Sequence, residues 1–149
     1  MDGVFLDTNV ILDYLTARQP FGIDALKFFE AAEEGTIKLY ASTLSLCNIA
    51  YIIRKITPNQ DVQKTINDLS SLLTLTPIDS AIIQKALLAN YKDFEDAVQY
   101  QSALSFSAIS HFVTRNKSDF QETTIPIMLP TEYWNPFGFE EEIPFELIN

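Results

Sequence analysis

Short apolar runs alternate along this chain with segments in which apolar residues recur every three or four positions. Runs of the first kind predict buried strands, and segments of the second kind predict amphipathic helices. We expect strands at residues 4–6, 37–41, 73–76, 108–113 and 125–129, the last at a sheet edge because it contains Pro126. Strands that alternate with helices favour parallel pairing through right-handed crossovers. The pattern therefore predicts an α/β fold, with a mostly parallel sheet of four to five strands and helices on both faces.

Polar residues mark where several of the intervening helices begin. Ser42, Asp79 and Asp93 precede helices expected at 43–56, from 80 to about 89 and from 94 to about 104. In each case a side-chain oxygen can accept a hydrogen bond from an N–H of the first turn. Two more helices are expected at 9–16 and 22–34, the second closed by Gly35. Pro58 is expected in the first turn of a helix that runs to about residue 73, because that turn does not need its N–H.

The composition is that of one globular domain. The chain has 149 residues, and 47% of them are hydrophobic, which is enough for a substantial core. Cys47 is the single cysteine, so an intramolecular disulfide is excluded and a reducing cytoplasm is expected. No apolar stretch approaches the length of a membrane helix, and the start does not resemble a signal peptide. We therefore expect a soluble, cytoplasmic protein without membrane contacts.

The charge is strongly negative, at −10. This balance argues against broad, non-specific nucleic-acid binding, which needs a basic surface. A nucleic acid bound through a metal ion is not excluded, because bound cations reverse the local field.

Residues 131–149 differ from the rest and predict an acidic, aromatic-rich extension of a domain at 1–130. They hold five of the twenty acidic residues, no Lys or Arg, and prolines that exclude a long helix. Two interpretations stay open: the extension packs on its own domain, or it docks on another chain. We favour packing on its own domain, because Trp134 and Phe137 need apolar partners.

The candidate chemistry lies in carboxylates near predicted strand ends. Asp7 follows the first strand, Asp96 lies at the start of a helix, and Asp119 follows the fourth strand closely. In open α/β sheets, sites form outside the carboxyl ends of the strands. Gathered carboxylates repel one another and are normally stabilised by a hard divalent cation such as Mg²⁺ or Mn²⁺. The natural reaction of such a site is metal-assisted hydrolysis of a phosphodiester. The lone His111 is expected to be structural.

The order and spacing of these segments resemble the three acidic motifs of PIN domains, and most of all VapC-type toxins of bacterial toxin–antitoxin pairs. The motifs are Leu6-Asp7-Thr8-Asn9, then Asp96, then Thr114-Arg115-Asn116-Lys117-Ser118-Asp119-Phe120, and the resemblance covers about residues 3–129. It implies a PIN-like three-layer sandwich and a Mg²⁺- or Mn²⁺-dependent endoribonuclease. Asp7, Asp96 and Asp119 would be the metal-binding and catalytic acids, converging within the reach of one ion. Thr8 and Asn9 would hold the first strand end, and Thr114 and Asn116 would support the last.

The resemblance also implies partners. These are an RNA substrate, a small antitoxin protein and a second copy of the chain, paired through the helix at 43–56 and the one that starts near Asn59. Arg18, Arg115 and Lys117 are the candidates for binding RNA phosphates.

Position 48 departs from the family pattern. The family brings a Glu on the third helix, and this chain has Asn48 there. An amide carries no charge, so the departure predicts weaker metal binding unless Asp93, one turn before Asp96, supplies the missing charge. It also keeps open a second function, a PIN-like module that binds RNA or protein with little or no catalysis. A phosphatase-type hydrolase is disfavoured, because Asp7-Thr8-Asn9 is not an Asp-x-Asp nucleophile motif.

Overall fold

β1 (Asp2–Leu6) lies at the centre of a five-stranded sheet whose order is β3-β2-β1-β4-β5. The computed structural model describes residues 1–121 and 124–135. The other strands are β2 (Ile37–Ser42), β3 (Thr74–Thr76), β4 (His111–Val113) and β5 (Ile127–Met128), and every pairing is parallel. The expected parallel sheet is confirmed, and β5, which follows Pro126, is an edge strand as expected.

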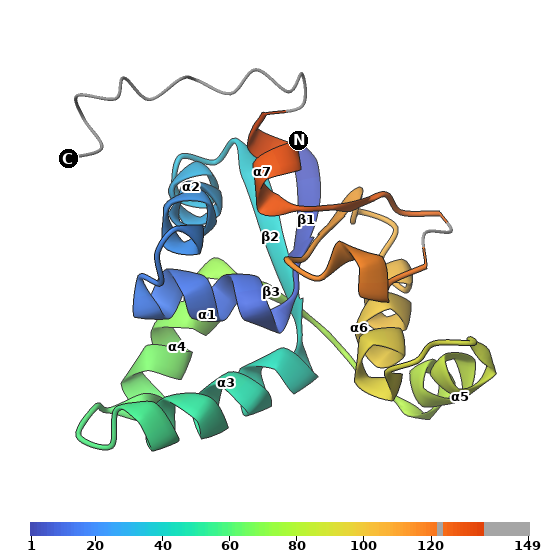
Figure 1. Cartoon of the computed structure of the whole chain (residues 1–149), viewed down its shortest axis with the longest axis horizontal. Helices are drawn as coiled ribbons and strands as arrows, with labels where there is room; N and C mark the ends of the chain where they lie inside the picture. Colours follow the sequence, from blue (N-terminus) through green and yellow to red (C-terminus); the bar gives the residue numbers. More distant parts are fainter. Residues whose placement is uncertain (122–123, 136–149) are drawn as a thin grey trace.

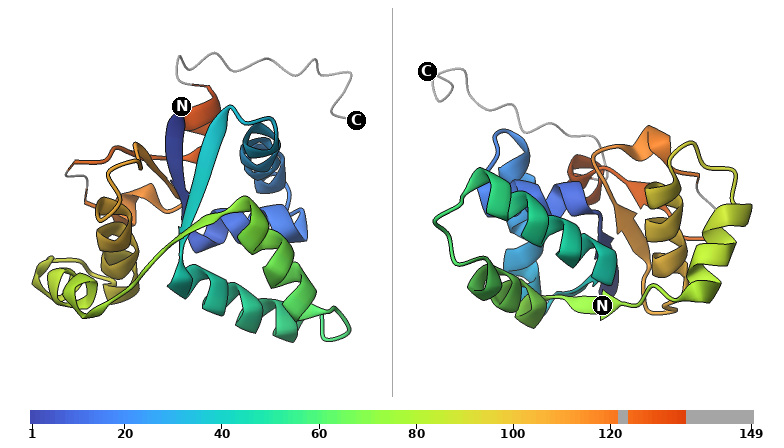
Figure 2. Two further views of the ribbon diagram at one scale, coloured as in Figure 1. Left: turned by 180° about the vertical axis from the view of Figure 1, so that it is seen from behind. Right: turned by 90° about the horizontal axis from the view of Figure 1, so that it is seen from below.

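Helices cover both faces of this sheet, so the expected three-layer sandwich is confirmed (Figures 1 and 2). The helices are α1 (Thr8–Thr16), α2 (Phe21–Glu33), α3 (Thr43–Ile56), α4 (Val62–Leu72), α5 (Ser80–Leu88), α6 (Phe94–Leu104) and α7 (Pro130–Trp134). Helices α1 to α4 lie on one side, and α5 and α6 lie on the other (Figure 1). None of the helices within the described residues is long and apolar enough to span a membrane.

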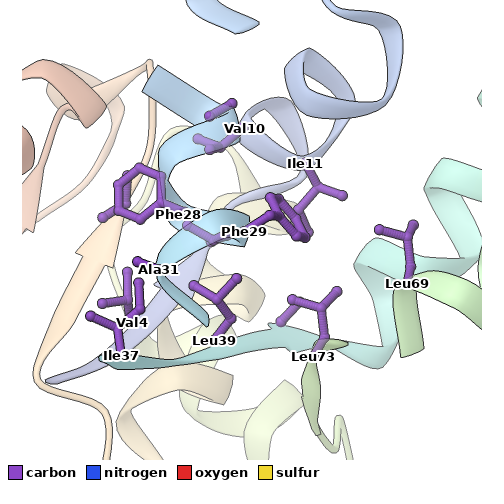
Figure 3. Close-up of a cluster of buried hydrophobic side chains, with 14 of the residues drawn as sticks. Val4, Val10, Ile11, Phe28, Phe29, Ala31, Ile37, Leu39, Leu69 and Leu73 are labelled. Atoms are coloured by element: carbon purple, nitrogen blue, oxygen red, sulfur yellow. The ribbon is translucent and has the colours of Figure 1, made fainter. Parts of the chain in front are cut away.

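The alternation of side chains along β1 divides the core between the two faces. Val4 and Leu6 pack with α1, α2 and α3 in the larger apolar cluster, part of which Figure 3 shows. Phe5 points to the opposite face, where its ring stacks on Phe112 at a centroid distance of 5.0 Å. All three side chains are fully buried. Burial on both faces explains why this strand reads as a continuous apolar run.

Several expected boundaries are wrong by a few residues, such as the start of β1 and both ends of β5, and two others have a clear physical reason. Pro58 lies before α4 and not in its first turn, because Asp61 caps the helix through a hydrogen bond from the Lys64 N–H at 3.1 Å. β4 begins at His111 and not at residue 108, because a turn precedes it, in which the Ile109 N–H donates to the Phe106 carbonyl. The caps expected at Ser42, Asp79 and Asp93 are confirmed.

α7 contains the first residues after Pro130 and packs on α2. The rings of Tyr133 and Trp134 lie 5.2 and 4.9 Å from the ring of Phe28, centroid to centroid. The indole N–H of Trp134 donates to the Asp24 carbonyl at 3.2 Å, and the Tyr133 hydroxyl donates to Asp2 at 2.8 Å. Trp134 therefore has the apolar partners on its own domain that the sequence required. Phe137 lies outside the described residues, and the division of the chain at residue 130 stays a prediction.

Trp134→Ala should lower the free energy of unfolding by about 2 kcal/mol or more, somewhat less than for a fully buried Trp, because the ring is half-buried against Phe28. Urea unfolding followed by circular dichroism measures this change. Leu88→Ala is the control, since Leu88 is 88% exposed and should change stability little. An equal effect of the two substitutions would show that α7 adds nothing to the core.

Candidate active site

Asp7 stands at the carboxyl end of the central strand and is only 7% exposed. Its carboxylate caps α1, where Oδ1 accepts a hydrogen bond from the Thr8 N–H at 2.8 Å. Oδ2 accepts a hydrogen bond from the Thr114 hydroxyl at 2.9 Å. Both carboxylate oxygens are therefore held in fixed directions, one by the start of α1 and the other by the residue that follows β4.

The ends of β1 and β4 are tied together by side chains that follow each strand. Asn9 accepts from the Arg115 N–H at 3.2 Å and donates to the Thr114 hydroxyl oxygen at 3.4 Å. The Asn116 N–H donates to the same hydroxyl oxygen at 3.1 Å. Thr114 is completely buried and thus connects Asp7 with the loop that leads to Asp119.

The structure places Asp7, Asp96 and Asp119 close enough for their charges to interact. Burial raises the pKa of Asp7 to about 6, against the lowering effect of its two hydrogen bonds, and nearby Glu95 and Asp119 add to the rise. Partial burial, together with the charges of Asp7, Asp93, Asp119 and Glu95, raises the pKa of Asp96 to about 7. The surrounding negative charges therefore make the ionised forms of Asp7 and Asp96 less favourable.

The carboxylate oxygens themselves do not form the tight cluster that the sequence predicted. Within residues 1–121 and 124–135, no group of three His, Cys, Asp or Glu side chains is placed to hold a metal ion. Asp119 lies exposed in the 3-10 turn Lys117–Asp119, and Asp96 is half-buried in the first turn of α6. The three aspartates therefore interact electrostatically, but their oxygens are not arranged as the ligands of one metal ion.

Asn48 lies beside an acid that the sequence analysis did not assign. Its side-chain N–H donates to Glu95 Oε1 at 2.8 Å and so joins α3 to α6. Asp93, the alternative source of the missing charge, caps α6 as expected: its Oδ1 accepts from the N–H groups of Glu95 at 2.9 Å and Asp96 at 3.3 Å. The position of Glu95 next to Asp96 was the available signal, but only the packing of α3 on α6 showed its partner.

Gln99 is a second residue that the sequence analysis missed. It lies three residues after Asp96 on α6 and is 1% exposed. Its Oε1 accepts from the Ser42 hydroxyl at 2.6 Å, and its Nε2 donates to the Ser45 hydroxyl at 3.0 Å. The Ser45 and Thr8 hydroxyls lie 2.8 Å apart. This buried network fixes the first turn of α6 against the starts of α1 and α3, and a polar residue among apolar ones was its only sign in the sequence.

The three basic residues expected to bind RNA have partners of different kinds. Arg115 Nε lies 2.6 Å from Oδ2 of buried Asp13, and its guanidinium lies 4.3 Å from the Phe21 ring centre. Lys117 Nζ lies 3.0 Å from Glu132 in an exposed pair, and the Arg18 guanidinium lies 5.7 Å from the same Phe21 ring. Exposed pairs exchange easily with other anions, whereas an ion pair with a buried carboxylate does not. Arg115 is therefore a poor candidate for binding phosphates, and Lys117 and Arg18 stay candidates.

A family model described as PIN domain matches residues 3–118. The chain belongs to the PIN domain family. Asp7 and Asp96 lie inside the matched range of this PIN domain, and Asp119 follows it directly. Among curated protein sequences none matches the chain significantly.

Solved structures of similar fold include a toxin–antitoxin complex and two VapBC complexes. A toxin–antitoxin complex from Klebsiella pneumoniae gives a TM-score of 0.63 at 21% identity, and the match covers 85% of this chain and 97% of the other. DNA-bound VapBC from Salmonella typhimurium gives 0.63 at 16% identity, with 87% and 99% covered. VapBC2 from Rickettsia felis, bound to a DNA fragment of its promoter, gives 0.61 at 14% identity, with 85% and 98% covered. At these identities the likeness shows the PIN fold.

Asp96→Asn should raise the free energy of unfolding at pH 8 by about 1 kcal/mol and leave it unchanged at pH 4. The effect is small because Asp96 is only half-buried and water screens its charge. Because the pKa values of Asp7 and Asp96 are raised to about 6 and 7 in the folded state, that state binds more protons than the unfolded state between about pH 4 and 7. Stability therefore falls as the pH rises through this window, and removing one charge reduces the loss. Urea unfolding in metal-free buffer at several pH values measures it.

Asp68→Asn is the matched control, because Asp68 forms only an exposed pair with Lys64 on α4. It should leave the pH dependence as in the wild type. A wild-type protein that gains stability from pH 5 to pH 8 would contradict the raised pKa values.

Proposed function

We propose that this PIN domain is a divalent-metal-dependent endoribonuclease and the toxin of a toxin–antitoxin pair. The observation that carries the proposal is buried Asp7, held at the end of β1 by Thr8 and Thr114. The charge of Asp119 acts on both Asp7 and Asp96, and the charge of Asp7 acts on Asp96. Such an arrangement lowers the stability of the fold at neutral pH, which is typical of functional sites. A bound cation would offset the repulsion between the carboxylates.

The donor set fits Mg²⁺ or Mn²⁺. All the acids present oxygen, as does the Asn48 amide, and hard divalent cations prefer oxygen ligands. Asp7 would hold the ion, with Asp96 and Asp119 completing the site from α6 and from the 3-10 turn after β4. Asp119 is exposed and can change rotamer at small cost, so an ion can draw it inward.

The chain's own residues would prepare and orient the reacting groups. The Thr8 N–H and the Thr114 hydroxyl fix the carboxylate of Asp7, which keeps a ligand in place without further ordering. Asp96 must lose its proton before it binds a cation, so metal binding strengthens as the pH rises past 7. Lys117 and Arg18 would hold the RNA phosphates. The metal, when bound, activates water and stabilises negative charge at the phosphate.

A protein partner is proposed from the similar structures. Those from Klebsiella pneumoniae, Salmonella typhimurium and Rickettsia felis are toxin–antitoxin complexes, and we propose a small antitoxin for this chain as well. We also propose a cytoplasmic homodimer. Tyr51 and Ile56 on α3 are 59% and 54% exposed and offer apolar surface for the pairing of two copies.

The second candidate function is a PIN domain that binds RNA or protein without cleaving it. Asn48 favours this candidate, because an amide at this position contributes no charge to the metal site. The two functions differ in one measurement, which is the release of shorter RNA products in the presence of metal.

The wild-type protein should cleave single-stranded RNA in Mn²⁺ or Mg²⁺, and EDTA should stop the reaction. Asp7→Asn should lower the rate by about 100-fold or more, since loss of a metal ligand exceeds the 10–100-fold cost of changing its supports. Gel analysis of a labelled RNA measures both rates, with DNA of the same sequence as a second substrate. Asp68→Asn should cleave like the wild type. RNA binding without products at any metal concentration would establish the binding module instead.

Light scattering at micromolar concentration should give the mass of a dimer. Tyr51→Lys should yield monomers, because a charge replaces an exposed aromatic ring on α3. Ile23→Lys on α2, where Ile23 is 56% exposed, is the control and should leave the mass unchanged. A monomeric wild type would remove the homodimer from the proposal.

A further inference from the structure

We infer that Glu95, held in position by Asn48, supplies the fourth carboxylate of the metal site. It takes the place of the acid that the family pattern brings from the third helix. The inference rests on the proposed metal-dependent function and assigns a metal-binding role to a residue outside the three acidic motifs. The observation behind it is the hydrogen bond of 2.8 Å between the Asn48 amide and Glu95 Oε1.

The contact joins the two helices that border the site. Asn48 lies in the second turn of α3, which starts directly after β2, and Glu95 lies in the first turn of α6, next to Asp96. An amide that replaces a carboxylate at position 48 can donate an N–H, which a Glu there could not. The neighbouring carboxylate of Glu95 is thereby brought to the α3 side of the site. The charge is thus shifted from one helix to the other and is not lost.

The negative charge of Glu95 interacts with two of the proposed metal-binding acids, Asp7 and Asp96. Its charge raises the pKa values of both Asp7 and Asp96, although Asp7 comes from β1 and Glu95 from α6. Glu95 accepts the Asn48 hydrogen bond through Oε1, and its side chain is exposed. Asp93 is less suited to this role, because its Oδ1 already accepts two N–H groups at the start of α6.

A purely structural explanation competes with this assignment. An acid in the first turn of a helix is favoured by the helix dipole, and an exposed hydrogen bond between helices adds a little stability. Both effects are independent of metal. Mn²⁺ affinity, measured by calorimetry on the metal-free protein, therefore separates the two explanations and does not depend on enzymatic activity.

Glu95→Gln should weaken Mn²⁺ binding by about 10–100-fold. Asn48→Glu alone should not strengthen it in proportion to the added charge, because the new carboxylate would face Glu95 directly. The double variant Asn48→Glu with Glu95→Gln exchanges the two groups, so that Gln donates and Glu accepts, and should bind Mn²⁺ within a few-fold of the wild type. Glu30→Gln is the matched control on α2, four residues before its connection to β2 at the opposite end of the sheet, and should bind like the wild type.

The outcomes are distinct. Weakened binding in Glu95→Gln together with recovery in the double variant supports the assignment. Wild-type affinity in Glu95→Gln, at an unchanged melting temperature, overturns it and leaves the proposed nuclease function standing. A wild-type protein that binds no Mn²⁺ overturns the metal-dependent function and this assignment together. Glu95 is exposed, so its replacement by the isosteric Gln is compatible with the fold.

Discussion

The burial of one carboxylate at the end of the central strand is the constraint on which the rest of the site depends. Asp7 is placed by the central strand β1 and is itself buried, so water cannot fully stabilise its charge. Two hydrogen bonds offset part of the desolvation, and both come from elements that the sheet positions. A buried ionisable group in a sheet of this kind costs stability, and the surrounding acids increase that cost. Stability is therefore lowered at this site, as it commonly is where ionisable groups are gathered for a function.

The acids are held near one another against their repulsion by neutral polar groups. Gln99 links α6 to Ser42 and Ser45, and through Ser45 to Thr8 at the start of α1. Each of these buried groups would be costly if left unsatisfied, so the network has one favoured arrangement. That arrangement sets how far the first turn of α6, with Asp96, lies from the end of β1. The uncharged network therefore determines the geometry of the charged site.

Positive charge around the site is largely engaged by other acids. Arg115 neutralises buried Asp13 within the domain, and Lys117 pairs with Glu132 at the surface. The first pair fixes the loop after β4 to α1. The second joins that loop to α7, the segment whose aromatic rings pack on Phe28. The acids at the strand ends are thus not neutralised by the nearest basic residues, which is consistent with a site that takes its counter-charge from solution.

The sequence by itself determined the succession of the five strands and of helices α1 to α6 along the chain, and the strand that carries Asp7. These follow from local patterns, since apolar runs, caps such as Ser42 and breakers such as Pro126 act over a few residues. It did not determine the start of α4, where the Asp61 cap prevailed over Pro58. Nor could it find the partners of Asn48, Gln99 and Arg115, which lie 47, 54–57 and 102 residues away along the chain. Such contacts depend on how helices pack across the sheet, and only the tertiary structure decides that, because a side chain's spacing in the sequence does not specify what lies opposite it.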